Sequence, residues 1–202
     1  MGILSNIKKI FSNEEKTAPT PAPAPKPKDP TTFYIDTLEF ERTQKDRYLR
    51  TDAYSPIEDR MNFEGLDYYP PNLDYRYTLS LNPVEKEEEI TFQTSTGDEQ
   101  IYFKVGTIDF EVDGEPAQLA VYKSADYDDL FLPFRDATSG SETYGAGRYL
   151  EPQELGSGDL LVDFNLAYNP FCAYSESYSC PMPPFENHLK VAIRAGEKAY
   201  TK

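Results

Sequence analysis

Between residues 75 and 121 the apolar side chains recur at every second position, and short turn sequences interrupt the pattern. A period of two is typical of strands that bury one face and expose the other. The first run has as its apolar members Tyr75, Tyr77, Leu79 and Leu81. Asp113-Gly114 is a strong hairpin signal, and residues 95–98 mark a second turn. This stretch therefore predicts antiparallel strands.

The apolar phase slips by one position along the second hairpin and its continuation. The apolar residues are first Ile101, Phe103 and Val105, and then Ile108, Phe110 and Val112. One extra residue at Gly106-Thr107, which is a β-bulge, explains the slip. Later strands are expected over residues 130–134, 160–166 and 189–193. We therefore expect a mainly β protein, with an antiparallel β-roll or barrel-like sheet and short N-terminal helices.

Two short helices are predicted before the strands. Asp36 with Glu39 three residues later is a helix-start signal, and Ser55-Pro56 begins a second helix that ends at Gly65. Both are interpreted as scaffold elements. The 16 Tyr and 12 Phe residues predict a core that is aromatic and better suited to strands.

Three regions are expected along the chain. Residues 1–12 predict a short amphipathic helix, residues 13–30 a disordered Ala/Pro-rich linker, and residues 31–202 a single β-rich globular domain. The apolar stripe of residues 1–12 suits a membrane surface or a protein partner, and the alternatives are packing on the domain or a frayed start. Without a long apolar run or a signal-peptide pattern, we expect a cytoplasmic protein, with peripheral membrane contact as an option.

The formal net charge is −15, from 35 acidic and 20 basic residues. Nucleic-acid affinity comes from clustered Lys and Arg side chains, so this balance argues against a nucleic-acid partner. The charge leaves a small molecule, a protein or a membrane surface as the expected partner classes.

A dense group of hydrogen-bonding side chains lies between residues 131 and 149, beside a predicted strand. Its members are Arg135, Asp136, Thr138, Ser139, Glu142 and Arg148, interleaved with three glycines. No Lys-Ser/Thr pair or helix start follows these glycines, so the run is not a nucleotide-binding phosphate loop. A glycine-rich turn between strands is the simpler interpretation.

A family resemblance rests on two long runs, LFLPFRDATSGSETYGAGRYLE and LVDFNLAYNPFCAYSESYSCPMPPFENHLKVAIRAGEK, and on the shorter KDRYLRTDAYSPI and FEGLDYYPPN. These runs resemble the signature blocks of an uncharacterised prokaryotic family, number 1684 in the domain-of-unknown-function series, over residues 36–200. The resemblance implies membership and leaves function open, because that family has no assigned reaction. Many of its members lack the N-terminal helix and linker, so this part departs from the family pattern.

The two cysteines, Cys172 and Cys180, precede the single histidine, His188. A zinc site needs four ligands at tighter spacing, so no metal is expected, and the sequence carries no cofactor motif. A Cys-His nucleophile pair would rest on this one histidine and is discounted. We interpret the cysteines as buried thiols. The alternative is a local disulfide that closes a loop of about nine residues.

Three interpretations of the polar side chains remain. In the first, they bind a small polar or anionic molecule, and the candidate ligand-binding residues are Arg135, Asp136, Ser139, Glu142, Arg148, Asp163, Asn165, Asn169, Asn187 and Arg194. Asp163 and Asn165 are expected to share one strand face. In the second, a hydrolase uses as acid and base two of Glu142, Asp163 and Glu186. The third is a structural network, with activity in the N-terminal tether. We place the enzyme last, because the usual catalytic histidine, reactive cysteine or metal set is missing.

Overall fold

The computed structural model describes residues 29–125 and 129–201. The amphipathic helix predicted for residues 1–12 and most of the predicted linker lie outside the described residues. The last linker residue, Pro30, is instead the first residue of a helix. Within the described ranges, no helix is both long and apolar enough to cross a membrane.

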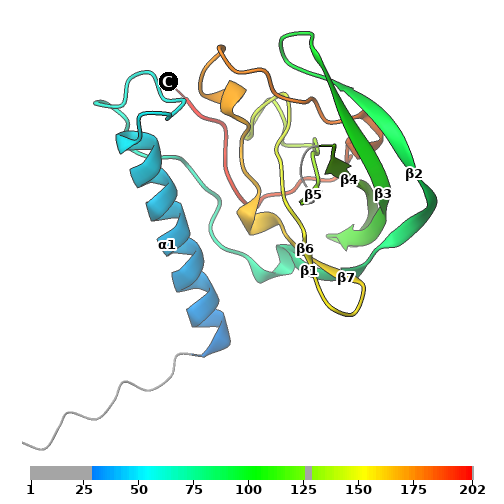
Figure 1. Cartoon of the computed structure of the whole chain (residues 1–202). Coiled ribbons are helices and arrows are strands. Elements are labelled where there is room, and N and C mark those ends of the chain that lie inside the picture. Colours follow the sequence, from blue (N-terminus) through cyan, green and yellow to red (C-terminus); the bar gives the residue numbers. More distant parts are fainter. Residues whose placement is uncertain (1–28, 126–128, 202) are drawn as a thin grey trace, which may run out of the picture.

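Among the described residues, seven strands form two antiparallel sheets (Figure 1). The larger sheet has the order β2-β3-β4-β5 and comprises β2 (Asn82–Gln93), β3 (Glu99–Val112), β4 (Glu115–Ser124) and β5 (Leu130–Phe131). The smaller has the order β1-β7-β6 and comprises β1 (Arg76–Ser80), β7 (Asp159–Asp163) and β6 (Gln153–Glu154). The long strands curl into a half-barrel (Figure 1), which confirms the predicted fold class.

The helical part is one helix of 22 residues, α1 (Pro30–Thr51), rather than several short helices. Asp29 is the N-cap, and its carboxylate accepts hydrogen bonds from the backbone N–H groups of Thr31 and Thr32 at 3.1 Å. The predicted start at Asp36 is therefore wrong, because Asp36 lies inside this helix. Pro at the first helical position is favoured there, since the missing N–H would have no helical partner.

The second predicted helix, from Ser55 to Gly65, does not form, and the chain there runs through turns. Ser55 does accept a hydrogen bond from the backbone N–H of Ile57 at 3.1 Å, as a cap would. Tertiary packing decides against a helix, because Ile57 and Phe63 turn inward against Leu49 of α1 and join a buried cluster with Tyr174. Within residues 66–201 the remaining helices are single 3-10 turns, namely η1 (Leu73–Tyr75), η2 (Phe164–Leu166), η3 (Phe171–Ala173) and η4 (Phe185–Asn187).

The predicted bulge is confirmed one residue earlier than expected. The pairing of β3 with β4 skips Val105, which lies between Lys104 and Gly106. Before this extra residue the even-numbered Tyr102 joins the second aromatic cluster, whereas after it the even-numbered Ile108, Phe110 and Val112 face the main core. The predicted Asp113-Gly114 turn is also confirmed, with φ values of 53° and 83° that fit a tight hairpin.

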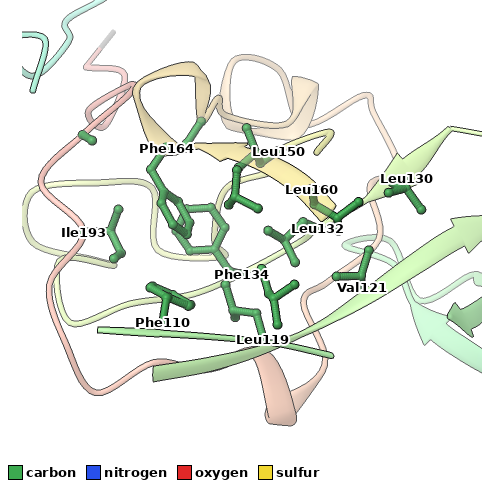
Figure 2. Close-up of a cluster of buried hydrophobic side chains, with 14 of the residues drawn as sticks. Phe110, Leu119, Val121, Leu130, Leu132, Phe134, Leu150, Leu160, Phe164 and Ile193 are labelled. Atoms are coloured by element: carbon green, nitrogen blue, oxygen red, sulfur yellow. The ribbon is translucent and has the colours of Figure 1, made fainter. Parts of the chain in front are cut away.

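The main core fills the half-barrel with side chains from both sheets and from the segments that close it (Figure 2). Phe164 is fully buried at its centre and makes ring contacts with Tyr77, Phe110 and Phe134. A second aromatic layer on the other face of the sheet consists of Phe92, Tyr102, Ala120 and Tyr122. Burial on both faces explains why β4 shows four consecutive buried residues and no clean alternation.

Three later strand predictions need correction, two at their ends and one entirely. The strand predicted over residues 160–166 stops at Asp163, because Phe164–Leu166 turn into η2. The strand predicted over 130–134 is regular only at Leu130–Phe131, although residues 132 and 134 continue pairing with 150 and 148. No strand forms over 189–193, where the backbone instead hydrogen-bonds to residues 135 and 137.

Candidate functional site

Arg148 is at the centre of a buried network and has 1% of its surface exposed. Its guanidinium donates to the Asp136 carboxylate at 2.9 Å and to the backbone carbonyls of Ile193, Ala195 and Glu197. The Asp136 side chain is equally buried, so this is a fully desolvated ion pair. Four of the five guanidinium N–H groups are used, and Nε has no acceptor. The pair ties the glycine-rich turn to the C-terminal segment.

The turn that follows Asp136 is closed by its own side chains. The Asp136 carboxylate accepts from the backbone N–H of Thr138 at 2.7 Å, and the hydroxyls of Thr138 and Thr143 lie 2.8 Å apart. Ser139 accepts from the backbone N–H of Asp136 at 3.1 Å. These bonds saturate one another, so Asp136 and Ser139 build the turn in this structure and present no opening. Arg135 has a half-buried side chain without an ion-pair partner among the described residues.

Asp163 and Asn165 meet as predicted, although not on one strand face. Asp163 ends β7 opposite Arg76 of β1, and the Arg76 Nε donates to its carboxylate at 3.1 Å. Asn165 lies in η2, where its backbone and side-chain N–H groups donate to the same carboxylate at 3.1 Å and 3.0 Å. Tyr34 of α1 completes the group with a 2.8 Å hydrogen bond. Burial and the adjacent Asp163 raise the pKa of Tyr34, so its phenol remains a donor.

Glu142 lies at the surface and pairs with Arg194 at 2.8 Å, and Tyr69 donates to it at 3.0 Å. Hydrogen bonds from Arg194 and Tyr69 lower the pKa of Glu142. Glu186 pairs instead with Lys104 and Tyr122 at 2.5 Å each. Burial raises the pKa of Glu186, but the bonds from Lys104 and Tyr122 outweigh it and leave the pKa lowered.

No two of the three candidate catalytic carboxylates share a partner among the described residues. A general acid at neutral pH needs a raised pKa, whereas those of Glu142 and Glu186 are lowered. The geometry therefore lends no support to an acid and base pair among them.

Asn187 and Asn169 are buried backbone connectors. The Asn187 side chain accepts from the backbone N–H of Ala120 at 2.8 Å and donates to the carbonyls of Ala120 and Pro133, which fixes η4 against β4. Asn169 donates to the Lys198 carbonyl at 2.8 Å. The Asn187 amide is thus satisfied by protein contacts on both its oxygen and its nitrogen, whereas the Asn169 side chain is held through its nitrogen alone.

A cleft of about 180 Å³ lies between α1 and the domain, and it includes several residues that the sequence patterns did not indicate. Figure 1 shows the C-terminal segment, in red, on the side of the domain that faces α1. The polar side chains that line the cleft are Glu41, Arg42, Lys45, Tyr68, Asn165, Tyr168 and Glu197. Of these only Asn165 was a predicted site residue.

Glu197 is a buried carboxylate with 1% exposure at the base of this cleft. It forms an ion pair with Lys45 of α1. It also accepts hydrogen bonds from the backbone N–H of Asn169 at 2.8 Å and from the Tyr174 hydroxyl at 2.6 Å. A buried charge is tolerated only when it is paired and hydrogen-bonded in this way. Glu197 therefore neutralises Lys45 and attaches α1 to the domain.

Arg42 differs from Lys45 because no carboxylate pairs with it among the described residues. Its terminal nitrogens donate to the carbonyls of Tyr69 at 3.0 Å and Asn165 at 3.3 Å, and its guanidinium stacks 4.4 Å above the centre of the Tyr68 ring. Burial lowers the pKa of Arg42, which reflects the loss of hydration around its charge. Arg42 is thus a cation that has lost part of its hydration, and the groups in direct contact with its guanidinium are neutral carbonyls and a tyrosine ring.

Two buried donors in the cleft have no acceptor, namely Arg42 Nε and the Tyr68 hydroxyl. The described residues contain only two other buried side-chain polar atoms of this kind, Arg148 Nε and Asn169 Oδ1. Burial, with Glu197 as the next cause, raises the pKa of Tyr68, so the hydroxyl keeps its proton. An unpaired buried donor costs about 1–3 kcal/mol, so the two donors in this cleft are the polar groups there that call for an explanation.

The sequence signal for this cleft was weak because its residues come from four separate parts of the chain, at positions 38–45, 68, 165–168 and 197. In the sequence Arg42 and Asp46 have the spacing of an i,i+4 pair on an exposed helix face, which does not indicate a binding site. Glu197 lies in the signature run that ends in RAGEK. Its place as a single acidic residue after Ala195 and Gly196 was the one sequence signal that it is buried.

Neither cysteine is buried, and both are free thiols with intermediate exposure. The interpretation of the two cysteines as thiols therefore holds in this structure, but the expected burial is wrong, and no disulfide joins them. His188 lies apart from the thiols, with its ring Nε2 3.2 Å from the Pro183 carbonyl. Among the described residues, no three His, Cys, Asp or Glu side chains are grouped so as to hold a metal ion.

Comparisons with known proteins were consistent with one another. The family of proteins of unknown function DUF1684 matches residues 61–198. A solution NMR structure of an uncharacterized protein from Haloarcula marismortui is similar at 40% sequence identity, with a TM-score of 0.64, and the match covers 83% of this chain and 95% of that one. No curated protein matches the chain.

Proposed function

This chain belongs to the DUF1684 family of proteins of unknown function, and on that premise we propose that its β-rich domain binds a small oxyanion. The binding site is the cleft between α1 and the domain, where Arg42 and Tyr68 are the anion receptors. The observation that carries the proposal is the pair of buried, unpaired donors on these two residues.

The chemistry of the cleft suits an oxyanion for three reasons. A carboxylate or phosphate oxygen accepts several hydrogen bonds at once, which is what two unpaired donors need. The terminal nitrogens of Arg42 donate to the backbone carbonyls of Tyr69 and Asn165, so the Nε–H group remains for such an acceptor. The volume of about 180 Å³ is below the 300–1,000 Å³ range of pockets for drug-sized ligands. The cleft therefore accommodates a single anionic group.

The local charge balance permits an anion although the whole chain is acidic. Glu197 is already neutralised by Lys45, and Glu41 is exposed to solvent at the rim. Arg42 forms no ion pair with a carboxylate among the described residues, and Glu39 and Glu197 act on its charge only at longer range. A bound oxyanion would complete this set of charges.

The cleft replaces Arg148 as the proposed anion receptor. Arg148 is buried and uses four of its donors on protein acceptors, so it supports the structural interpretation of the polar cluster. Arg135 is half-buried, and none of its nitrogens is among the buried side-chain atoms without a partner in the described residues. The proposal of a polar or anionic ligand is therefore kept, with Arg42 and Tyr68 in place of the arginines predicted from the sequence.

Tyr68→Phe is expected to weaken phosphate binding about tenfold, the equivalent of about 1.4 kcal/mol, because one hydrogen bond to a charged acceptor is lost. Without phosphate the variant should be at least as stable as the natural chain, since only an unpaired hydroxyl is removed. Isothermal titration of the full chain with inorganic phosphate, and separately with acetate, measures the affinity and the preferred shape of the anion.

Tyr54→Phe is the matched control, because Tyr54 is 82% exposed and remote from this cleft. Arg42→Lys should weaken binding further than Tyr68→Phe, since an ammonium cannot reproduce the planar donor fork. The proposal fails if the natural chain binds neither phosphate nor acetate, or if Tyr68→Phe and Tyr54→Phe bind equally well.

A further inference from the structure

The two cysteines form a contact that the anion cleft does not use. The backbone N–H of Cys172 donates to the sulfur of Cys180 at 3.3 Å. Because a cysteine's own N and Sγ are separated by only three bonds, this contact brings the two sulfurs close together. The Tyr144 hydroxyl donates to the sulfur of Cys172 at 3.7 Å and lies 3.5 Å from its carbonyl. The site is therefore a dithiol with an adjacent phenol donor.

Backbone contacts hold both cysteines in place. Cys172 is the middle residue of η3, a 3-10 turn that follows Pro170. Cys180 is joined to the turn between β2 and β3, where the backbone N–H of Ser95 donates to its carbonyl at 2.9 Å and its own N–H donates to the Ser95 hydroxyl at 3.2 Å. Two separate parts of the fold thus bring the sulfurs to one point, eight positions apart in sequence.

Both cysteine residues are partly exposed, which places the dithiol near the protein surface. The rings of Phe171, next to Cys172 in the chain, and Tyr178 pack edge to face with centres 5.2 Å apart. The titratable side chains that face the pair, besides the two thiols, are Tyr144 and Tyr149. Within the described ranges neither cysteine has a carboxylate or cationic partner among its hydrogen bonds.

We propose that Cys172 and Cys180 are a redox-active dithiol that low-molecular-weight disulfides oxidise to an intramolecular disulfide. Cys172 is the nucleophile and Cys180 the resolving thiol. The proposal is independent of anion binding, because the dithiol shares no residue with the cleft.

The reaction takes place in two exchange steps that balance. The Cys172 thiolate attacks one sulfur of glutathione disulfide, a bond forms between these sulfurs, the glutathione disulfide bond breaks, and one glutathione thiolate leaves. The Cys180 thiol then gives its proton to solvent and attacks the sulfur of Cys172, which releases the second glutathione. Overall two protein thiols lose two electrons and two protons, and one glutathione disulfide becomes two glutathione molecules.

The hydrogen bonds of the pair assign these roles. The thiol of Cys180 donates to Cys172, and this bond lowers the pKa of Cys172 to about 6 against the opposing effect of burial, with further help from the Tyr144 and Ser95 hydroxyls. The same bond raises the pKa of Cys180. Burial, with Cys172 as the next cause, raises the pKa of Tyr144, so the phenol stays a donor. Thiolate is the reactive form, so Cys172 attacks first.

The test is incubation of the reduced full chain with glutathione disulfide, followed by intact mass and non-reducing peptide mapping. The natural chain should lose two hydrogens and show a Cys172–Cys180 peptide pair. Cys180→Ser should stop at one glutathione adduct on Cys172, and Cys172→Ser should react at least tenfold more slowly. The proposal is overturned if the natural chain keeps stable glutathione adducts without an internal disulfide, or if Cys172→Ser reacts as fast as Cys180→Ser.

A pH profile separates a tuned nucleophile from an ordinary thiol. The rate of iodoacetamide alkylation at Cys172 in the natural chain should rise with an inflection near pH 6, below the usual cysteine value of about 8.5. Tyr144→Phe should move the inflection upward, because the phenol no longer stabilises the thiolate. Tyr178→Phe is the matched control and should leave it unchanged. An inflection at the ordinary value in the natural chain would overturn the assignment of Cys172 as nucleophile.

Discussion

Arg148→Met is expected to lower the free energy of unfolding by about 3–5 kcal/mol, because removing one partner of a buried ion pair leaves the other charge uncompensated. Arg148 and Asp136 are both almost fully buried, and their atoms lie 2.9 Å apart. The variant also leaves the carbonyls of Ile193, Ala195 and Glu197 without this donor. Urea-induced unfolding, followed by circular dichroism, measures the loss.

Arg135→Met is the matched control for this variant. Arg135 is half-buried and has no ion-pair partner among the described residues, so its replacement should change stability by about 0.5 kcal/mol or less. A double variant, Arg148→Met with Asp136→Leu, should recover part of the loss, because the unpaired carboxylate is removed as well. If Arg148→Met unfolds at the same urea concentration as Arg135→Met, Arg148 is not the structural tie that we describe.

Gly196→Ala is the second variant with a large expected effect. Gly196 has φ of +76°, where a side chain costs about 1–2 kcal/mol. A Cβ atom there would also lie 2.4 Å from the Ala167 carbonyl oxygen and 2.8 Å from that of Phe164. Forcing atoms into such packed space costs about 1–3 kcal/mol more. The total expected loss is therefore about 2–5 kcal/mol in the same unfolding measurement.

Gly97→Ala isolates the steric part of this effect. Gly97 has a similar φ of +88°, but a Cβ atom there would meet no atom within 4 Å. Its loss should therefore be limited to the backbone cost of about 1–2 kcal/mol. Equal losses for the two variants would show that the close approach of Gly196 to residues 164 and 167 is not a constraint on the fold.

The predictions for Arg148 and Gly196 both concern the C-terminal segment 193–197, which contacts the glycine-rich turn, α1 and η2. Its carbonyls hold Arg148 and the glycine-rich turn, and Glu197 binds Lys45 of α1. Gly196 allows the chain to pass close to η2 between these contacts. Disturbing this segment should therefore weaken the half-barrel and the cleft beside α1 together.

The features that the sequence predicted correctly depend on neighbouring residues. The alternation from Tyr75 to Leu81 predicted β1, and the Asp113-Gly114 turn predicted the hairpin of β3 and β4. The phase slip predicted a bulge at Gly106-Thr107, which lies one residue earlier, at Val105. Each of these signals comes from steric preferences within a few residues. Family membership was likewise predictable, because the signature runs are contiguous in the chain.

The errors arose where distant contacts outweighed local preference. Residues 55–65 carry helix-start signals, yet Ile57 and Phe63 gain more by packing against Leu49 and Tyr174. Asp163 and Asn165 were predicted to share a strand face, but the chain turns after Asp163 so that both side chains converge through η2. Arg148 was expected to face a ligand, and the C-terminal carbonyls occupy it instead.

The sequence by itself determined the mainly β class, the hairpins and the family, because these follow from periodicity and contiguous motifs. Only the tertiary structure decided which polar groups are satisfied and which are not. Arg42, Tyr68 and Glu197 are separated by up to 155 positions and meet in one cleft, and Cys172 approaches Cys180 because Ser95 of a distant turn holds the second cysteine. Hydrogen-bond saturation and burial depend on these long-range contacts, and no local pattern encodes them.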